Sequence, residues 1–232
     1  MTAIWRIATN YVREQRWAVV LLLVWVVVSA GIVSIGELAS EDVLFFLKQQ
    51  AIYGVAFSAF LAASAIYNER RSRRILAVLS KGIEREQYLA GLILGVLLSA
   101  ALYCAVMGAF GSLMFRRIGL PLEALWYLLA LLIVACALAA TTAMSFATFS
   151  PPLVAIALTA LVLGIGGGMA QIGLTRNLFP VMTLMASITD FTGHAPLLHR
   201  WDTLAWGIAQ TIALWMAASW IFSRRDIAVA VE

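Results

Sequence analysis

The side chains that could bind a metal ion gather in one segment of the C-terminal half. His194 and His199 are the two histidines of the chain, and imidazole nitrogen is a common ligand of transition metals. Carboxylates and thioethers that could complete such a site stand nearby, at Asp190, Asp202, Met182 and Met185. The same residues are typical of a water-exposed loop whose methionines pack a neighbouring helix, and we favour that interpretation. His194 and His199 are kept as candidates, and no metal is assigned.

The sequence lacks the residue patterns of the common catalytic sites. It contains no GxxxxGK[ST] phosphate loop, so we do not expect it to bind a nucleotide by that route. A membrane serine protease needs a buried serine and a histidine from another span, whereas both histidines lie outside the apolar stretches. We assign no catalytic residue and expect that the chain is not an enzyme by itself.

A short charged segment, Asn68–Gln87, separates two long apolar stretches. It carries six basic residues against three acidic ones, at Arg70, Arg71, Arg73, Arg74, Lys81, Arg85 and at Glu69, Glu84, Glu86. In a helix that begins at Ser72, apolar side chains share an arc of about 160°, at Ile75, Leu76, Val78 and Leu79. Such a patch, ringed by guanidinium groups, suits a groove on a partner protein with carboxylates at its rim. It also suits lipid headgroups, and these residues alone leave both alternatives open.

The composition indicates a membrane protein. Hydrophobic residues make up 63% of the 232 and charged residues 12%, against about a half and a quarter in soluble domains. The mean hydropathy is +0.94, so lipid must be the solvent for much of the surface. The net charge of +4 does not indicate a nucleic-acid partner, because the basic residues flank apolar stretches. Cys104 and Cys136 lie in apolar runs, and we interpret both as small buried hydrophobic residues.

Charged residues delimit the apolar stretches. A hydrocarbon core of about 30 Å needs roughly twenty helical residues. The uncharged run 124–175 is too long for one span, and Pro151-Pro152 divides it into two. The sequence therefore predicts an all-α membrane protein with six transmembrane helices, near Trp17–Gly36, Gln49–Tyr67, Tyr88–Phe115, Ala124–Ser145, Leu153–Gln171 and Thr203–Ser223.

Three further segments complete a single transmembrane domain. Residues 1–16 predict an amphipathic interfacial helix, with Trp5 on its apolar side and Arg6 and Arg13 on the other, that lies flat on the inner leaflet. A signal-peptide start is disfavoured, because the apolar run after it is as long as a full span. Within 172–202, the apolar stretch Asn177–Thr189 is too short to cross and predicts a re-entrant outer hairpin.

The domain is thus divided as follows: interfacial helix 1–16, spans one and two in 17–67, cytoplasmic loop 68–87, spans three to five in 88–171, outer re-entrant segment 172–202, span six in 203–223 and a tail at 224–232. With the N-terminus inside, eleven lysines and arginines lie on the inner face and five on the outer. The positive-inside rule then predicts that both termini are cytoplasmic. We expect a multi-pass protein of the cytoplasmic membrane.

Glycines mark places where helices could approach closely. Gly91 and Gly95 stand four residues apart in the third span, a spacing typical of tight helix contacts. The fifth span carries a second group, at Gly164, Gly166, Gly167 and Gly168. Packing within one chain, packing in a dimer and a place beside a substrate pathway all remain open for these residues. Glycine costs about 1 kcal/mol relative to alanine in a helix, so the second group should also weaken the helix there.

This order of parts, together with one short motif, resembles the permease subunit of ABC type-2 exporters. The motif residues are Glu69, Arg70, Ser72, Ile75, Leu76, Leu79 and Ser80, followed by Gly82, Ile83 and Arg85 and by Tyr88–Gly91. The tail Phe222–Asp226 also resembles the family's usual ending. The likeness in organisation covers nearly the whole chain. Arg73 and Arg74 depart from the pattern, because small or polar residues are common at those positions.

The resemblance implies a transport function. The segment from Glu69 to Ser80, with Arg73 and Arg74, would be the coupling helix that docks on a separate ATPase subunit, which binds ATP and Mg²⁺. The chain itself would hold no cofactor. Two permeases, identical or paralogous, would form a cavity lined by spans one, two and five in the lipid bilayer. Because no ionisable residue lies near the middle of a span, an amphipathic or lipid-like substrate is favoured.

Two other functions stay open. The chain could be the membrane subunit of a cytochrome c maturation or copper-processing ABC complex, in which case the segment with His194 and His199 would matter. It could also be a non-transporting membrane anchor that recruits a cytoplasmic protein through Asn68–Gln87. An intramembrane enzyme ranks below both. The sequence does not name the substrate.

Overall fold

The structure, a computed structural model of the chain, describes residues 2–35, 39–71, 84–168, 179–181 and 201–224. It is all-helical over these residues, as the sequence predicts. The helices are α1 (Thr2–Glu14), α2 (Arg16–Ile35), α3 (Ser40–Arg71), α5 (Arg85–Ile118), α6 (Leu122–Ala147), α7 (Pro152–Gly168) and α9 (Trp201–Arg224).

Five of these helices are long and apolar enough to cross a membrane: α2, α3, α5, α6 and α9. The predicted first, third, fourth and sixth spans match α2, α5, α6 and α9 closely at both ends. The helix of the predicted fifth span, α7, has 17 described residues and is not among the five.

The predicted second span lies within a longer helix. We placed its start at Gln49, after Lys48, whereas α3 begins at Ser40. Its first turn contains Glu41 and Asp42, and carboxylates there interact favourably with the positive end of the helix dipole. Charged residues can therefore belong to the helix rather than mark its boundary.

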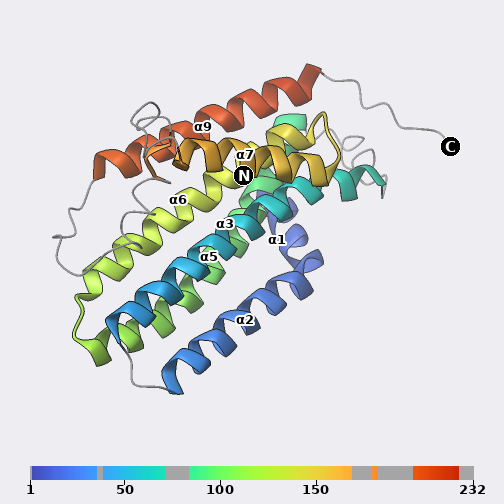
Figure 1. Cartoon of the computed structure of the whole chain (residues 1–232). Coiled ribbons are helices and arrows are strands. Elements are labelled where there is room, and N and C mark those ends of the chain that lie inside the picture. Colours follow the sequence, from blue (N-terminus) through green and yellow to red (C-terminus); the bar gives the residue numbers. More distant parts are fainter. Residues whose placement is uncertain (1, 36–38, 72–83, 169–178, 182–200, 225–232) are drawn as a thin grey trace.

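The most deeply buried helix is α6. It contacts α3, α5, α7 and α9, and most of its residues are buried. Alanines at many of these positions, Ala135, Ala139, Ala140 and Ala143 among them, are wholly covered, and small side chains let neighbouring helices come close. Figure 1 shows α3, α5 and α6 side by side, with α2 on one flank and α7 and α9 on the other.

One end of the bundle holds α1 together with the C-terminal part of α3 and the N-terminal part of α5 (Figure 1). At the opposite end, α5 turns into α6. Gly119 closes α5 in the left-handed region, with φ 71°, and its N–H donates to the carbonyl oxygen of Phe115. Glycine suits that conformation because it has no Cβ.

The N-terminal helix is amphipathic, but its apolar side faces protein. Ala8 and Tyr11 are buried in the contact with α5, while Arg6 and Arg13 are exposed. The side that the sequence suggested would enter the leaflet is thus largely covered by α5. Trp5 stays 54% exposed and is available to the membrane interface.

The outer surface has the character of a lipid-facing surface. Large apolar side chains are exposed along α2 and α9, where a water-soluble protein would carry polar ones. Exposed Trp201 and Trp220 stand near the two ends of α9, about 28 Å apart at 1.5 Å per residue. This separation matches a hydrocarbon core of about 30 Å, and tryptophan is enriched at both membrane interfaces.

Candidate functional site

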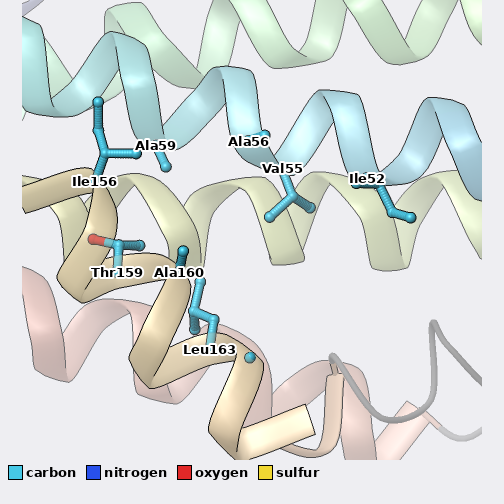
Figure 2. Close-up of a pocket in the computed structure, with 9 residues that line it drawn as sticks. Ile52, Val55, Ala56, Ala59, Ile156, Thr159, Ala160 and Leu163 are labelled. Carbon is cyan, nitrogen blue, oxygen red and sulfur yellow. The ribbon is translucent and has the colours of Figure 1, made fainter. Parts of the chain in front are cut away.

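An apolar groove of about 300 Å³ lies between α3 and α7. Figure 2 shows side chains from both helices turned toward it. The residues of α3 that line it are Ile52, Val55, Ala56 and Ala59, and those of α7 are Ile156, Thr159, Ala160, Leu163 and Gly164. The groove therefore lies between the helices of the second and the fifth predicted spans.

Small residues create this groove. Ala56, Ala160 and Gly164 fill little of the space between the two helices, and a Cβ added at Gly164 would meet no heavy atom within 4 Å. Gly164 therefore makes no close helix contact in this structure and lies on the wall of an open groove. Branched side chains, such as Ile52 and Ile156, form other parts of the wall.

The groove offers hydrocarbon and very little hydrogen bonding. Thr159 is the one polar residue among the described residues of its lining, and the Thr159 Oγ1 donates to the carbonyl oxygen of Ala155 at 2.7 Å. Because that hydroxyl is already engaged within its own helix, a ligand would meet mainly methyl and methylene groups. Among the residues that the structure describes, no ionisable side chain lines the groove. Such a lining binds apolar chains by dispersion and by burial of their surface.

A buried hydrogen-bond network lies beside the groove helices and was not predicted. The Tyr103 hydroxyl of α5 lies 2.6 Å from the backbone oxygen and 2.9 Å from the side-chain Oε1 of Gln50 in α3. The Gln50 Nε2 donates to Ser29 Oγ of α2 at 2.9 Å. Gln50 and Tyr103 are each 1% exposed. Ser29 is partly buried. The network therefore connects three helices, and its two larger side chains lie inside the bundle.

Gly54 makes room for this network. A Cβ at position 54 would lie 2.8 Å from Cε1 and 3.3 Å from Cδ1 of Tyr103. The sequence held one signal, a glutamine and a glycine four residues apart within an apolar stretch. It did not indicate that a tyrosine fifty residues later would occupy the space beside that glycine.

Both cysteines are buried and free, as the sequence predicts. Cys104 of α5 is 2% exposed and Cys136 of α6 is fully buried. These thiols lie inside the helix bundle rather than on the groove wall.

The structure places the predicted glycines in different surroundings. Gly91 and Gly95 meet Ile7 and Tyr11 of α1, so their close contact lies within one chain. Gly166, Gly167 and Gly168 form the last described residues of α7, which stays helical through them. The rest of the predicted fifth span lies outside the described residues.

Most of the predicted docking segment also lies outside the described residues. Glu69 and Arg70 belong to the last turn of α3, while Ser72, Arg73, Arg74, Ile75, Leu76, Leu79 and Ser80 are not described. The candidate metal ligands His194 and His199 are likewise outside. Across the part of the chain that is described, no three His, Cys, Asp or Glu side chains are grouped as a metal ion would require.

A short described piece of the predicted re-entrant segment reaches the bundle interior. Val181 is completely buried and lies against Gly207 of α9, where Val134 of α6 is also close. Val134 stands near the middle of α6. The side chain of Val181, which comes from outside the long helices, thus lies level with the middle of α6. It occupies space that is free because Gly207 has no side chain.

A scan against protein-family models and a search of curated proteins both found no match. The class of the protein accordingly rests on its fold. The long apolar helices, their exposed hydrophobic surface and the tryptophans at both ends of α9 indicate an all-helical, multi-pass membrane protein.

Proposed function

We propose that this chain is the permease subunit of an ATP-driven ABC exporter in the cytoplasmic membrane. The observation that carries the proposal is the uncharged groove between α3 and α7, because the resemblance assigns the substrate pathway to spans one, two and five. The order of parts along the chain supports the same function. Two such permeases form the pathway, and separate ATPase subunits bind ATP and Mg²⁺.

The proposed mechanism is alternating access driven from the cytoplasmic side. ATP closes the two ATPase subunits, and their movement displaces the docking segment, which includes Leu76 and Leu79. That segment joins the end of α3 to the start of α5, so its displacement acts directly on both helices. Because α3 forms one wall of the groove, a movement of α3 relative to α7 changes the shape of the groove. In this topology both termini are cytoplasmic.

The lining of the groove defines the substrate class. An ion or a polar solute would lose its hydration there and gain no charged or free polar partner in exchange. A hydrocarbon chain loses nothing and gains contacts along both walls. We therefore propose an amphipathic or lipid-like substrate whose apolar portion enters the groove between α3 and α7.

The proposal is tested by purifying the tagged chain from its native membranes. We expect a phosphate-loop ATPase to co-purify and ATP turnover to follow that subunit. Replacing Leu76 and Leu79 with Asp should abolish both co-purification and ATP turnover. A charge buried without a partner in the groove of the ATPase subunit costs more free energy than the loss of the leucine contact. The matched control changes Arg73 and Arg74 to Gln, which should weaken association only in a salt-dependent way.

Two results would overturn the proposal. One is turnover of ATP by the rigorously purified chain alone. The other is cross-linking of the wild-type chain, in intact membranes, to a cytoplasmic protein that is not an ATPase. This result would favour the membrane-anchor alternative. A change of ATPase activity on metal removal would instead favour the copper-processing or cytochrome c maturation complex.

A further inference from the structure

The N-terminal helix is packed into α5 at two glycines. A Cβ at Gly91 would lie 2.7 Å from Cβ and 2.8 Å from Cγ2 of Ile7, and 3.1 Å from the backbone oxygen of Ile4. A Cβ at Gly95 would lie 2.7 Å from Cδ1 of Tyr11 and 3.1 Å from the backbone oxygen of Ala8. Residues four apart lie on the same side of a helix. One side of α1 therefore fits against one side of α5 over about one helical turn.

The same helix is also bonded to α3. The Tyr11 hydroxyl donates to the backbone oxygen of Leu61 at 2.8 Å. Tyr11 is 4% exposed and Leu61 is fully buried, so water does not compete for this bond. Tyr11 thus contacts α5 through its ring and α3 through its hydroxyl, and it connects two helices that are separate in sequence.

These contacts lie close to the two ends of the docking segment. Leu61 is ten residues before the end of α3 at Arg71, and Gly91 is six residues after the start of α5 at Arg85. At 1.5 Å per residue these intervals are about 15 Å and about 9 Å. The helix α1 consequently contacts both α3 and α5 near the end of the bundle where α3 ends and α5 begins.

We infer that α1 holds α3 and α5 together, and we call this contact of three helices the tie. Gly91, Gly95 and Tyr11 are the positioning residues that keep α1 in place. A displacement applied to residues 72–83 is then carried by α1, α3 and α5 as one unit, because α1 adds its contacts to those that α3 and α5 already make with each other. The mechanical part of this inference rests on the proposed function, because an ATPase subunit supplies the displacement. The tie itself is independent of that function.

Hydrogen exchange and ATP turnover test the inference together. Gly95→Ala should push Tyr11 away from α5, because the new Cβ meets a ring carbon and backbone and not a flexible side-chain end. We expect amide exchange in residues 2–14 to become at least tenfold faster. The ATPase subunit should still co-purify, but stimulation of ATP turnover by vesicles made of the total lipid of the native membranes should be lost.

Two controls separate the tie from general damage. Gly31→Ala adds the same methyl group where nothing lies within 4 Å, and it should leave exchange in residues 2–14 unchanged. Tyr11→Phe adds no volume and removes the bond to the Leu61 oxygen. It should produce an intermediate increase in exchange, and it keeps the inference testable if Gly95→Ala does not fold.

These measurements distinguish a failure of the tie from a failure of the proposed function. If α1 exchanges no faster in Gly95→Ala and Tyr11→Phe than in the wild type, the tie is wrong whatever the chain transports. If α1 is released but lipid-stimulated turnover is unchanged, its role in carrying the displacement is wrong. If the wild-type chain binds no ATPase at all, the proposed function fails, and faster exchange in the two variants would still establish the tie between the helices.

Discussion

Gly54→Ala should destabilise the helix bundle, because position 54 faces the ring of Tyr103. The added methyl carbon would lie 2.8 Å from Cε1 and 3.3 Å from Cδ1 of that ring, well inside an ordinary contact of about 3.5–4 Å between carbon atoms. The ring is 1% exposed and its hydroxyl is held at 2.6 Å and 2.9 Å by the oxygens of Gln50. It therefore has little room to move without losing those bonds.

The size of the effect follows from three contributions. Overpacking in a filled core costs about 1–3 kcal/mol. Weakening a hydrogen bond between membrane helices costs about 0.6 kcal/mol on average and up to about 1.7 kcal/mol. Alanine is favoured over glycine in a helix by up to about 1 kcal/mol. We expect a net loss of about 1–3 kcal/mol in the free energy of unfolding.

The measurement is equilibrium unfolding in mixed detergent micelles, with Gly31→Ala as the matched control. Position 31 lies in α2 with nothing within 4 Å of the added Cβ, so that variant should be as stable as the wild type or up to about 1 kcal/mol more stable. Equal stability of Gly54→Ala and Gly31→Ala would refute the packing of Tyr103 against α3.

Two further predictions concern the outer segment and the topology. Gly207→Ala should lower the free energy of unfolding by about 1–3 kcal/mol in the same assay, because the new methyl group collides with Val181 and Val134. An unchanged free energy of unfolding would mean that Val181 does not lie against Gly207. Single cysteines at Ser80 and Gly193, introduced after Cys104 and Cys136 are changed to alanine, should react with a membrane-impermeant maleimide from opposite sides of the membrane, and labelling from the same side would contradict the six-span topology.

The long helices could be predicted because lipid imposes a simple requirement on sequence. About twenty apolar residues between charged ones suffice to identify a span, and α2, α5, α6 and α9 followed that pattern. The helix α3 contains the predicted second span but begins before it, and Glu41 and Asp42 belong to its first turn. The boundary of a helix depends on where its backbone bonds end, and charge alone does not determine that.

Contacts between helices could be predicted only in part. The spacing of Gly91 and Gly95 indicated a close approach, but α1 as their neighbour depends on how the N-terminal helix turns back onto α5. The bonds among Ser29, Gln50 and Tyr103 depend on which faces of three helices meet. The groove forms because α3 and α7 lie apart where both carry small residues. In the sequence, Ala56, Ala160 and Gly164 are as consistent with tight packing as with open space.

The most direct measurement for the transport function is the accessibility of the groove during ATP turnover. Ala160→Cys, in a chain with Cys104 and Cys136 changed to alanine, would report from the groove wall, and Trp220→Cys would report from the exposed face of α9. Both are labelled with maleimide in inside-out native membrane vesicles, with and without ATP and vanadate. We expect ATP with vanadate to change the labelling rate at position 160 at least severalfold and to leave the rate at position 220 unchanged. An identical rate at position 160 in every nucleotide state, in vesicles where the ATPase is bound and turning over, would contradict it.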